Sequence, residues 1–278
     1  MRRRDFLIGL AAIGLAGCVP AAAQPPFEPT RFSVEVRGSG PDVILIPGLT
    51  AGPNVWASTV AAVPGYRYHL VHVAGLADAP ARANASGPIV APLAEEIARY
   101  IEARRLRRPS IVGHSMGGTL AMMVAARRPE LVGRIMVVDM YPQPSGLLGG
   151  SPGRMRGLAD NLRDLASTPG GRRLFQSLIG SFATDRRSDP DVVGRAMHEL
   201  SALDLSGDLP AIRAPMTVVY AARDERSRAR TDQAFASAYA AARGARFVAI
   251  PNSGHMIMFD QPARLHEAVR EFLERGDQ

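Results

Sequence analysis

Short apolar runs alternate with longer helical patterns along most of this 278-residue chain, and this alternation limits the fold more than any other feature. Continuous apolar runs such as 43–46 are typical of strands buried on both faces. Seven runs are expected to be strands: 31–36, 43–46, 68–73, 110–112, 135–138, 216–220 and 246–250. Helical patterns lie between them, at 89–106, 115–128, 228–243 and 261–274. The alternation predicts an α/β fold with a mostly parallel sheet and helices on both faces.

One long segment interrupts this alternation. Residues 145–213 begin with a loop rich in Gly, Pro and Ser and contain no strand pattern, but they carry helical patterns at 155–165 and 171–179. We therefore predict a helical cap over 145–213, inserted between the two parts of an α/β core at 24–144 and 214–278.

The first 23 residues have the pattern of a signal peptide. A basic start is followed by an apolar run at 6–16, which is shorter than the ~20 residues needed to span a bilayer. Arg3 and Arg4 resemble the pair of a twin-arginine export signal. The pattern predicts export from the cytoplasm to the periplasm.

The end of this segment can be interpreted in two ways. Residues 15–18 resemble a bacterial lipobox, in which Cys18 is lipidated and becomes the new N-terminus. The alternative is ordinary cleavage after Ala23, which follows small residues. Under the first interpretation the protein contacts the membrane only through its N-terminal lipid.

Composition excludes several kinds of site. All 33 basic residues are Arg, so a Schiff-base lysine, a P-loop lysine and a Ser-Lys pair are excluded. The +7 charge is spread along the chain and aromatic residues make up only 6%, which argues against nucleic-acid binding. Cys18 is the only cysteine, so the mature chain has no cysteine nucleophile, internal disulfide or cysteine metal site. No metal or organic cofactor is predicted.

The clearest chemical motif is a G-x-S-x-G at 113–117, between the apolar run 110–112 and a helical pattern. A sharp strand-to-helix turn at this point lifts the Ser115 hydroxyl above the sheet. The glycines two residues before and after the serine let neighbouring backbone approach closely. The N-terminus of the following helix favours negative charge at the reacting centre.

With this elbow in its strand-turn-helix context, residues 31–275 resemble the α/β-hydrolase fold superfamily. The resemblance implies a capped serine hydrolase of the esterase or lipase type, acting on a small-molecule acyl ester through an acyl-enzyme. It also implies the chain order nucleophile, acid, histidine, and a cap at the position of 145–213. The same fold could cleave an amide, lactone or carbon–carbon bond or act as a perhydrolase, and an exported non-catalytic binding lipoprotein is a further alternative. The oligomeric state stays open.

A serine nucleophile needs a base, and His255 is the candidate. It lies in a loop after the last strand pattern, at the edge of the sheet where the elbow also lies. The family places its histidine there. His114 lies inside the elbow, and its side chain is expected to point away from the nucleophile.

The histidine in turn needs an acid to orient it. Asp224 follows the strand pattern 216–220 and matches the family's acid position, so it is the preferred candidate. Asp139, at the end of 135–138, is the rival, because some relatives keep their acid there. Glu225 is a third candidate.

Two backbone N–H groups are expected to form the oxyanion hole. One belongs to Met116, directly after the nucleophile. Family correspondence places the other on Leu49. Many relatives carry His-Gly where this chain has Pro47-Gly48, so the glycine of the turn is kept and the histidine is not.

Overall fold

The computed structural model describes residues 27–148, 152–166, 168 and 187–275. Its centre is a seven-stranded sheet in the order β1-β3-β2-β4-β5-β6-β7. The strands are β1 (Phe32–Gly38), β2 (Asp42–Ile46), β3 (Arg67–Val73), β4 (Ser110–His114), β5 (Arg134–Val138), β6 (Met216–Ala222) and β7 (Arg246–Pro251). Only β1 is antiparallel to its neighbour; all other pairs are parallel. The predicted mostly parallel sheet is confirmed.

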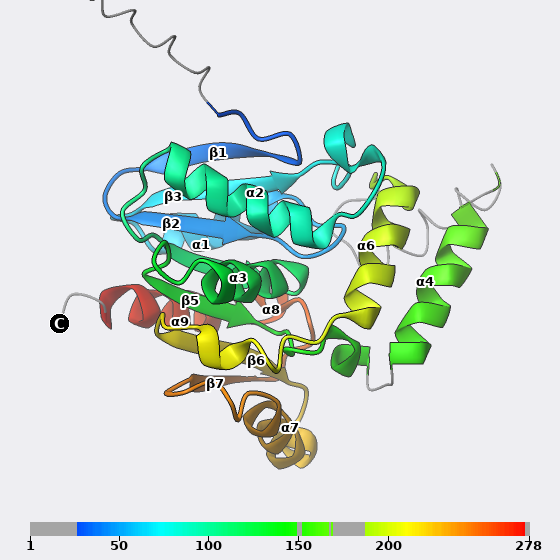
Figure 1. The fold of residues 1–278 in the computed structure, drawn as a ribbon. Helices are drawn as coiled ribbons and strands as arrows, with labels where there is room; N and C mark the ends of the chain where they lie inside the picture. Colours follow the sequence, from blue (N-terminus) through cyan, green and yellow to red (C-terminus); the bar gives the residue numbers. More distant parts are fainter. Residues whose placement is uncertain (1–26, 149–151, 167, 169–186, 276–278) are drawn as a thin grey trace, which may run out of the picture.

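Helices cover both faces of this sheet (Figure 1). One face carries α2 (Val90–Ala103), α3 (Met116–Arg127) and α7 (Glu225–Ala238), and the other carries α1 (Ala57–Ala62), α8 (Ile257–Asp260) and α9 (Pro262–Glu274). Each face has its own apolar core, because the strands present buried side chains to both sides. The helical patterns predicted from the sequence correspond to α2, α3, α7 and α9.

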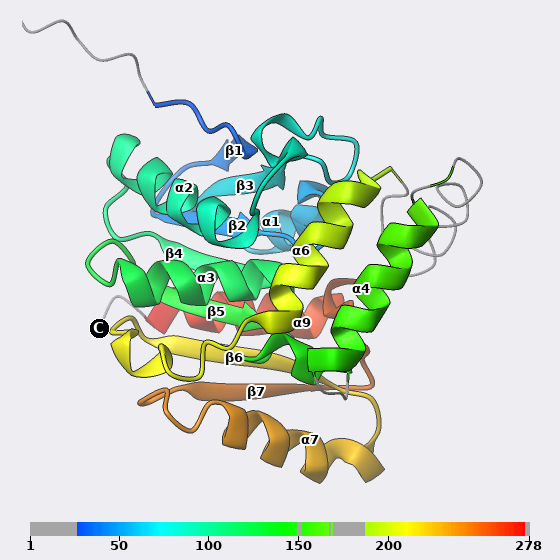
Figure 2. The same cartoon turned by 45° about the vertical axis from the view of Figure 1, so that its right-hand side comes forward.

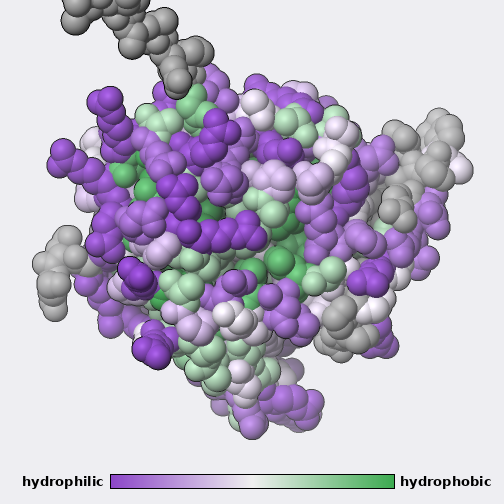
Figure 3. All heavy atoms as spheres, in the orientation of Figure 1, coloured by the Kyte–Doolittle hydropathy of each residue, from purple (hydrophilic) through white to green (hydrophobic). Residues whose placement is uncertain are grey.

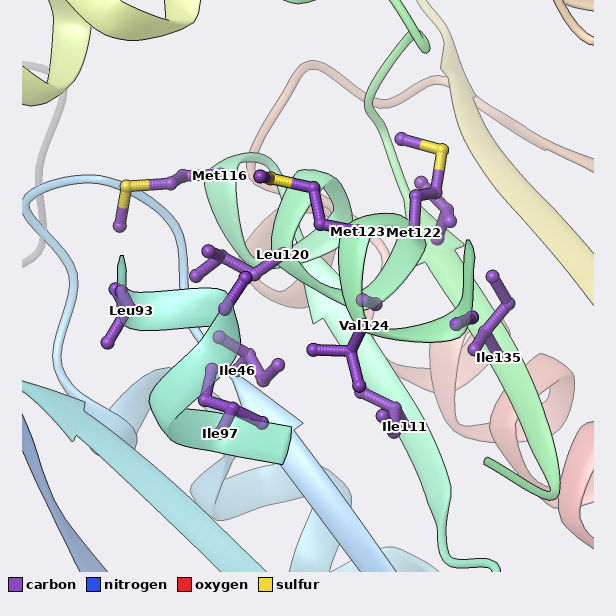
Figure 4. Close-up of a cluster of buried hydrophobic side chains, with 14 of the residues drawn as sticks. Ile46, Leu93, Ile97, Ile111, Met116, Leu120, Met122, Met123, Val124 and Ile135 are labelled. Carbon is purple, nitrogen blue, oxygen red and sulfur yellow. The ribbon is translucent and has the colours of Figure 1, made fainter. Parts of the chain in front are cut away.

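Helix α3 is buried along most of its length. All residues from Met116 to Ala125 are buried. Figure 4 shows its Leu120 and Val124 side chains next to Ile46, Ile97 and Ile111 of the neighbouring strands and helix. Because tight packing resists displacement, the N-terminal end of α3 is a fixed point in the molecule.

The segment between β5 and β6 contains α4 (Pro152–Ala166) and α6 (Pro190–Ala202), which pack against each other (Figure 2). Among its described residues there is no strand.

Short 3-10 turns occur elsewhere in the described chain as well as in this segment, at η1 (Pro53–Trp56), η2 (Arg82–Ala85), η3 (Pro144–Leu148) and η4 (Leu209–Ala211). The predicted helix 171–179 and the 1–23 segment with Cys18 lie outside the described residues.

Helix α6 is anchored to the core at the carboxyl edge of the sheet. The Asp189 N–H, just before α6, donates to the carbonyl of Gly75, just after β3, at 2.7 Å. The Glu199 carboxylate accepts the N–H groups of Ile89 and Val90 at 2.8 Å each, which caps the start of α2. These contacts place α6 beside the strand ends that carry the elbow.

Candidate active site

Ser115 occupies a strained turn between β4 and α3. Its backbone has φ 53° and ψ −122°, a left-handed φ that costs a non-glycine residue on the order of 1–3 kcal/mol. The Ser115 N–H donates to the carbonyl of Val138 at 2.9 Å, which ties the turn to β5. The side chain is largely enclosed, with 9% of the residue exposed. Such strain is typical of a nucleophile elbow.

The flanking glycines are required by close backbone contacts. A Cβ at Gly113 would lie 2.1 Å from the Gly117 carbonyl oxygen, and a Cβ at Gly117 would lie 2.2 Å from the Ile46 carbonyl oxygen. Neither distance is compatible with a side chain. The sequence motif therefore reflects a turn that only glycine permits at these two positions.

His255 is hydrogen bonded to Asp139. Its Nδ1 donates to Asp139 Oδ2 at 2.7 Å, and Asp139 Oδ1 accepts the Ala221 N–H at 2.9 Å. Asp139 follows β5, is buried and has a positive φ of 51°. The side chain of His255 is 36% exposed. One carboxylate oxygen of Asp139 therefore accepts the hydrogen bond from the histidine ring, and the other accepts a hydrogen bond from the backbone of β6.

The structure does not bring Asp224, the preferred candidate acid, to His255. Asp224 is exposed and caps α7: its Oδ1 accepts the Ser227 N–H at 2.7 Å and the Ser227 hydroxyl at 2.9 Å. These hydrogen bonds lower the pKa of Asp224. The physical reason is the short connection, because α7 begins at Glu225, three residues after β6 ends. Asp139, the rival candidate, takes the position beside the histidine.

The third candidate acid, Glu225, is the first residue of α7 and is exposed. A carboxylate in the first turn of a helix interacts favourably with the helix dipole. Asp224 is the residue directly before α7, and Asp is a preferred residue at that helix-capping position, so this signal could have separated Asp224 from Asp139.

His114 contacts His255 directly, although sequence reasoning had set it aside. Its Nε2 donates to the His255 carbonyl at 2.9 Å, and the two ring centroids are 4.6 Å apart. Burial, and then the neighbouring charge of His255, lowers the pKa of His114 to about 3. His114 is therefore a neutral side chain across the ordinary working range of an enzyme.

The two expected oxyanion groups flank Ser115. Met116 is the first residue of α3, so its N–H has no partner within the helix. Leu49 follows Gly48, where a Cβ would lie 3.1 Å from Ser115 Cβ. In the described part of the chain no acceptor contacts the Leu49 N–H. The Pro47-Gly48 turn thus brings this loop against the serine without the histidine that many relatives carry.

A separate cavity of about 520 Å³ lies where β1 and β3 meet the end of α2. It is lined by residues such as His69, Tyr100 and Arg104, and none of Ser115, Asp139 and His255 borders it. Within the ranges that the structure describes, no group of three or more His, Cys, Asp or Glu side chains could hold a metal. The same ranges contain no helix that is long and apolar enough to cross a membrane.

The fold and this elbow define the class of protein. The Alpha/beta hydrolase family matches residues 43–268, and the chain belongs to this family. Its relatives include Esterase Rv0045c of Mycobacterium tuberculosis, 28% identical over 85% of this chain and 84% of the relative. A pimeloyl-[acyl-carrier protein] methyl ester esterase of Vibrio atlanticus is 27% identical over 68% of this chain and 78% of the relative. These relatives support a hydrolase.

Solved structures agree with the fold. A thermophilic esterase from Thermogutta terrifontis has a TM-score of 0.73 at 20% identity, covering 89% of this chain and 94% of that chain. The enol-lactonase from Burkholderia xenovorans LB400 has a TM-score of 0.68 at 20% identity, covering 87% of this chain and 96% of that chain. At this level of identity the likeness shows the shared architecture alone.

Proposed function

We propose that this protein is a serine hydrolase that cleaves small or medium acyl esters through Ser115, His255 and Asp139. The observation that carries the proposal is the 2.7 Å hydrogen bond from His255 Nδ1 to the buried Asp139 carboxylate, beside the strained elbow of Ser115. A serine hydroxyl is a weak nucleophile and needs a base held in one tautomer, which is what this hydrogen bond provides.

In the proposed reaction His255 acts as a base and then as an acid in both half-reactions, acylation of Ser115 and its deacylation. With Nδ1 engaged by Asp139, His255 Nε2 is free to take the Ser115 proton as Oγ attacks the ester carbonyl carbon. Nε2–H then protonates the leaving alkoxide, so the alcohol departs and the acyl group remains on Ser115. A water molecule repeats the sequence, and it releases the carboxylic acid and restores the serine.

Negative charge develops on the carbonyl oxygen in both halves. The N–H groups of Met116 and Leu49 are proposed to donate to it, and each such donor is typically worth ~3 kcal/mol. The start of α3 adds a favourable dipole at the same position. The donor on Met116 is fixed by the buried helix that follows it. The donor on Leu49 depends on a loop, and its contribution is the more sensitive to substitution.

The surroundings and the relatives support an ester of an apolar acyl group. Partly buried apolar side chains near the carboxyl edge include Leu49, Tyr141, Leu147 and Met197. Figure 3 shows a mostly hydrophilic face with apolar atoms in its middle. Two relatives carry esterase names. Ester cleavage is therefore preferred to amide, lactone or carbon–carbon cleavage, and to a non-catalytic binding role.

Hydrolysis of p-nitrophenyl esters of increasing acyl length tests this proposal. Wild type should release p-nitrophenol with an optimum at short or medium chains, and Ser115→Ala should lose at least ~10³-fold in kcat/KM. The preferred chain length measures the size of the acyl pocket. Equal turnover by wild type and Ser115→Ala, or none on any ester, would contradict the proposal.

We also propose that the chain is exported and anchored by lipid at Cys18. The support is the order of Arg3-Arg4, the apolar run 6–16 and the lipobox-like 15–18. Fractionation of bacteria producing the full chain should place it with membranes, and Cys18→Ser should release it. An unmodified N-terminus on a cytoplasmic protein would contradict this proposal.

A further inference from the structure

The proposed base is held by two contacts of different kinds. Asp139, at the end of β5, binds the ring of His255 at 2.7 Å. His114, at the end of β4, binds the backbone of His255 through its carbonyl at 2.9 Å. The first contact sets the rotation and tautomer of the ring. The second sets the position of the backbone from which the ring projects.

The second contact links the base to the nucleophile over a very short path. His114 directly precedes Ser115 in the chain. The residue that binds the backbone of His255 is therefore joined to the proposed nucleophile by a single peptide bond. The rings of His114 and His255 also contact each other, with centroids 4.6 Å apart and planes tilted by 41°. A movement of the elbow would therefore carry the histidine with it.

Other contacts hold the residues of this loop that precede His255. Gly254 N–H donates to Asp260 at 2.7 Å, and Ser253 N–H approaches the Ala222 carbonyl at 3.4 Å. Neither contact reaches the backbone of His255 itself. In the described residues, His114 provides the hydrogen bond to the His255 carbonyl.

We propose that His114 is a positioning residue that fixes the place of His255 relative to Ser115, by donating its Nε2–H to the His255 carbonyl. This inference rests on the proposed function and adds a residue to it. His114 transfers no proton and touches no substrate in this role. It acts through His255 alone.

The chemistry of His114 fits a fixed donor. Its Nε2 faces a carbonyl, so Nε2 carries the proton and Nδ1 does not. Nδ1 is buried, and no hydrogen-bond partner for it occurs among the described residues. Gly48 packs against it so closely that a Cβ there would lie 3.0 Å away. A second proton on this ring would be a buried charge beside His255, and burial disfavours it.

Two amide substitutions separate positioning from general packing. In His114→Gln the side-chain nitrogen reaches about as far as Nε2, so it can still donate to the His255 carbonyl. In His114→Asn the amide reaches only as far as Nδ1 and leaves that carbonyl without its donor. Both variants replace a buried imidazole by a smaller amide, so both should lower the melting temperature. His266→Asn, on α9, is the matched control for replacing a histidine away from this contact.

The measurement is kcat and KM on the best p-nitrophenyl ester for all three variants, with melting temperatures. His114→Asn should lower kcat by about 10- to 100-fold with little change in KM, because a misplaced base slows the chemical step. His114→Gln should stay within about threefold of wild type, and His266→Asn should match wild type. Equal kcat for the Gln and Asn variants, or losses that simply follow the melting temperatures, would overturn the positioning role.

Hydrolysis by Ser115→Ala and NMR of the wild-type protein separate failure of the proposed function from failure of the positioning role. If Ser115→Ala hydrolyses the ester as fast as wild type, the proposed function fails; if only the His114 variants behave like wild type, the positioning role alone fails. If the variants do not fold, long-range nitrogen–proton NMR of the wild-type protein decides. It should show His114 as the neutral Nε2–H tautomer at pH 5, and an Nδ1–H tautomer would overturn the assignment.

Discussion

Replacing Asp139 by Asn should remove most of the esterase activity, because the two carboxylate oxygens of Asp139 have different hydrogen-bond partners. Oδ1 accepts the Ala221 N–H at 2.9 Å and Oδ2 accepts the His255 Nδ1–H at 2.7 Å. An asparagine that keeps the first hydrogen bond presents its NH₂ group to His255. Two donors cannot share that contact, so the ring adopts the tautomer with the proton on Nε2. His255 then cannot accept the Ser115 proton.

The expected size of this loss is about 10⁴-fold in kcat, as for the buried aspartate of other Ser-His-Asp triads. Each factor of ten is 1.36 kcal/mol, so the barrier rises by roughly 5 kcal/mol. Asp224→Asn is the matched control, because asparagine caps a helix about as well as aspartate. It should change kcat less than about twofold.

The assay is steady-state hydrolysis of a p-nitrophenyl ester by both variants, with circular dichroism to compare their folding. Loss of activity in Asp224→Asn and its retention in Asp139→Asn would refute the assignment of the acid. Loss in neither variant would refute the need for an orienting carboxylate.

Three further predictions concern stability. Gly117→Ala should destabilise the fold by more than about 2 kcal/mol in urea denaturation, because its Cβ meets the Ile46 carbonyl, whereas Gly157→Ala in α4 has open space and should be neutral or stabilising. Below pH 6.5 the unfolded chain protonates His114 and the folded chain does not until about pH 3. Wild type should therefore lose up to about 1.4 kcal/mol per pH unit relative to His114→Gln as pH falls through that window, and parallel curves would contradict this. Glu199→Gln loses one of the two carboxylate oxygens that accept N–H groups at the start of α2, so it should lower the melting temperature; an unchanged value would show that this cap contributes little.

Local sequence patterns were sufficient for the sheet and for the elbow. Apolar runs such as 43–46 have to be buried on both faces, and the close backbone contact between residues 113 and 117 requires glycine at 113. These are constraints within a few residues, and they can be read without knowing the rest of the molecule. The segment 145–213 stands out in the sequence for the same reason, as a stretch without strand patterns, and its role as a cap stays a prediction.

Contacts between distant residues were harder to predict. Asp139 and Asp224 both follow parallel strands at the same edge of the sheet, so strand order alone cannot choose between them. The choice depends on the turn after each strand: Asp139 has a positive φ and binds His255, while Asp224 starts a helix. The contact of His114 with His255 joins residues 141 positions apart, and no local pattern indicates it.

In the proposed reaction Ser115 forms a covalent bond to the substrate acyl group. Labelling with a fluorophosphonate, which traps activated serines, followed by peptide mass spectrometry shows whether Ser115 is such a nucleophile. One phosphonyl adduct is expected, on the peptide that contains Ser115, together with strongly slowed labelling in His255→Ala and Asp139→Asn. An adduct on a different serine, or no adduct on a protein that still hydrolyses esters, would contradict it.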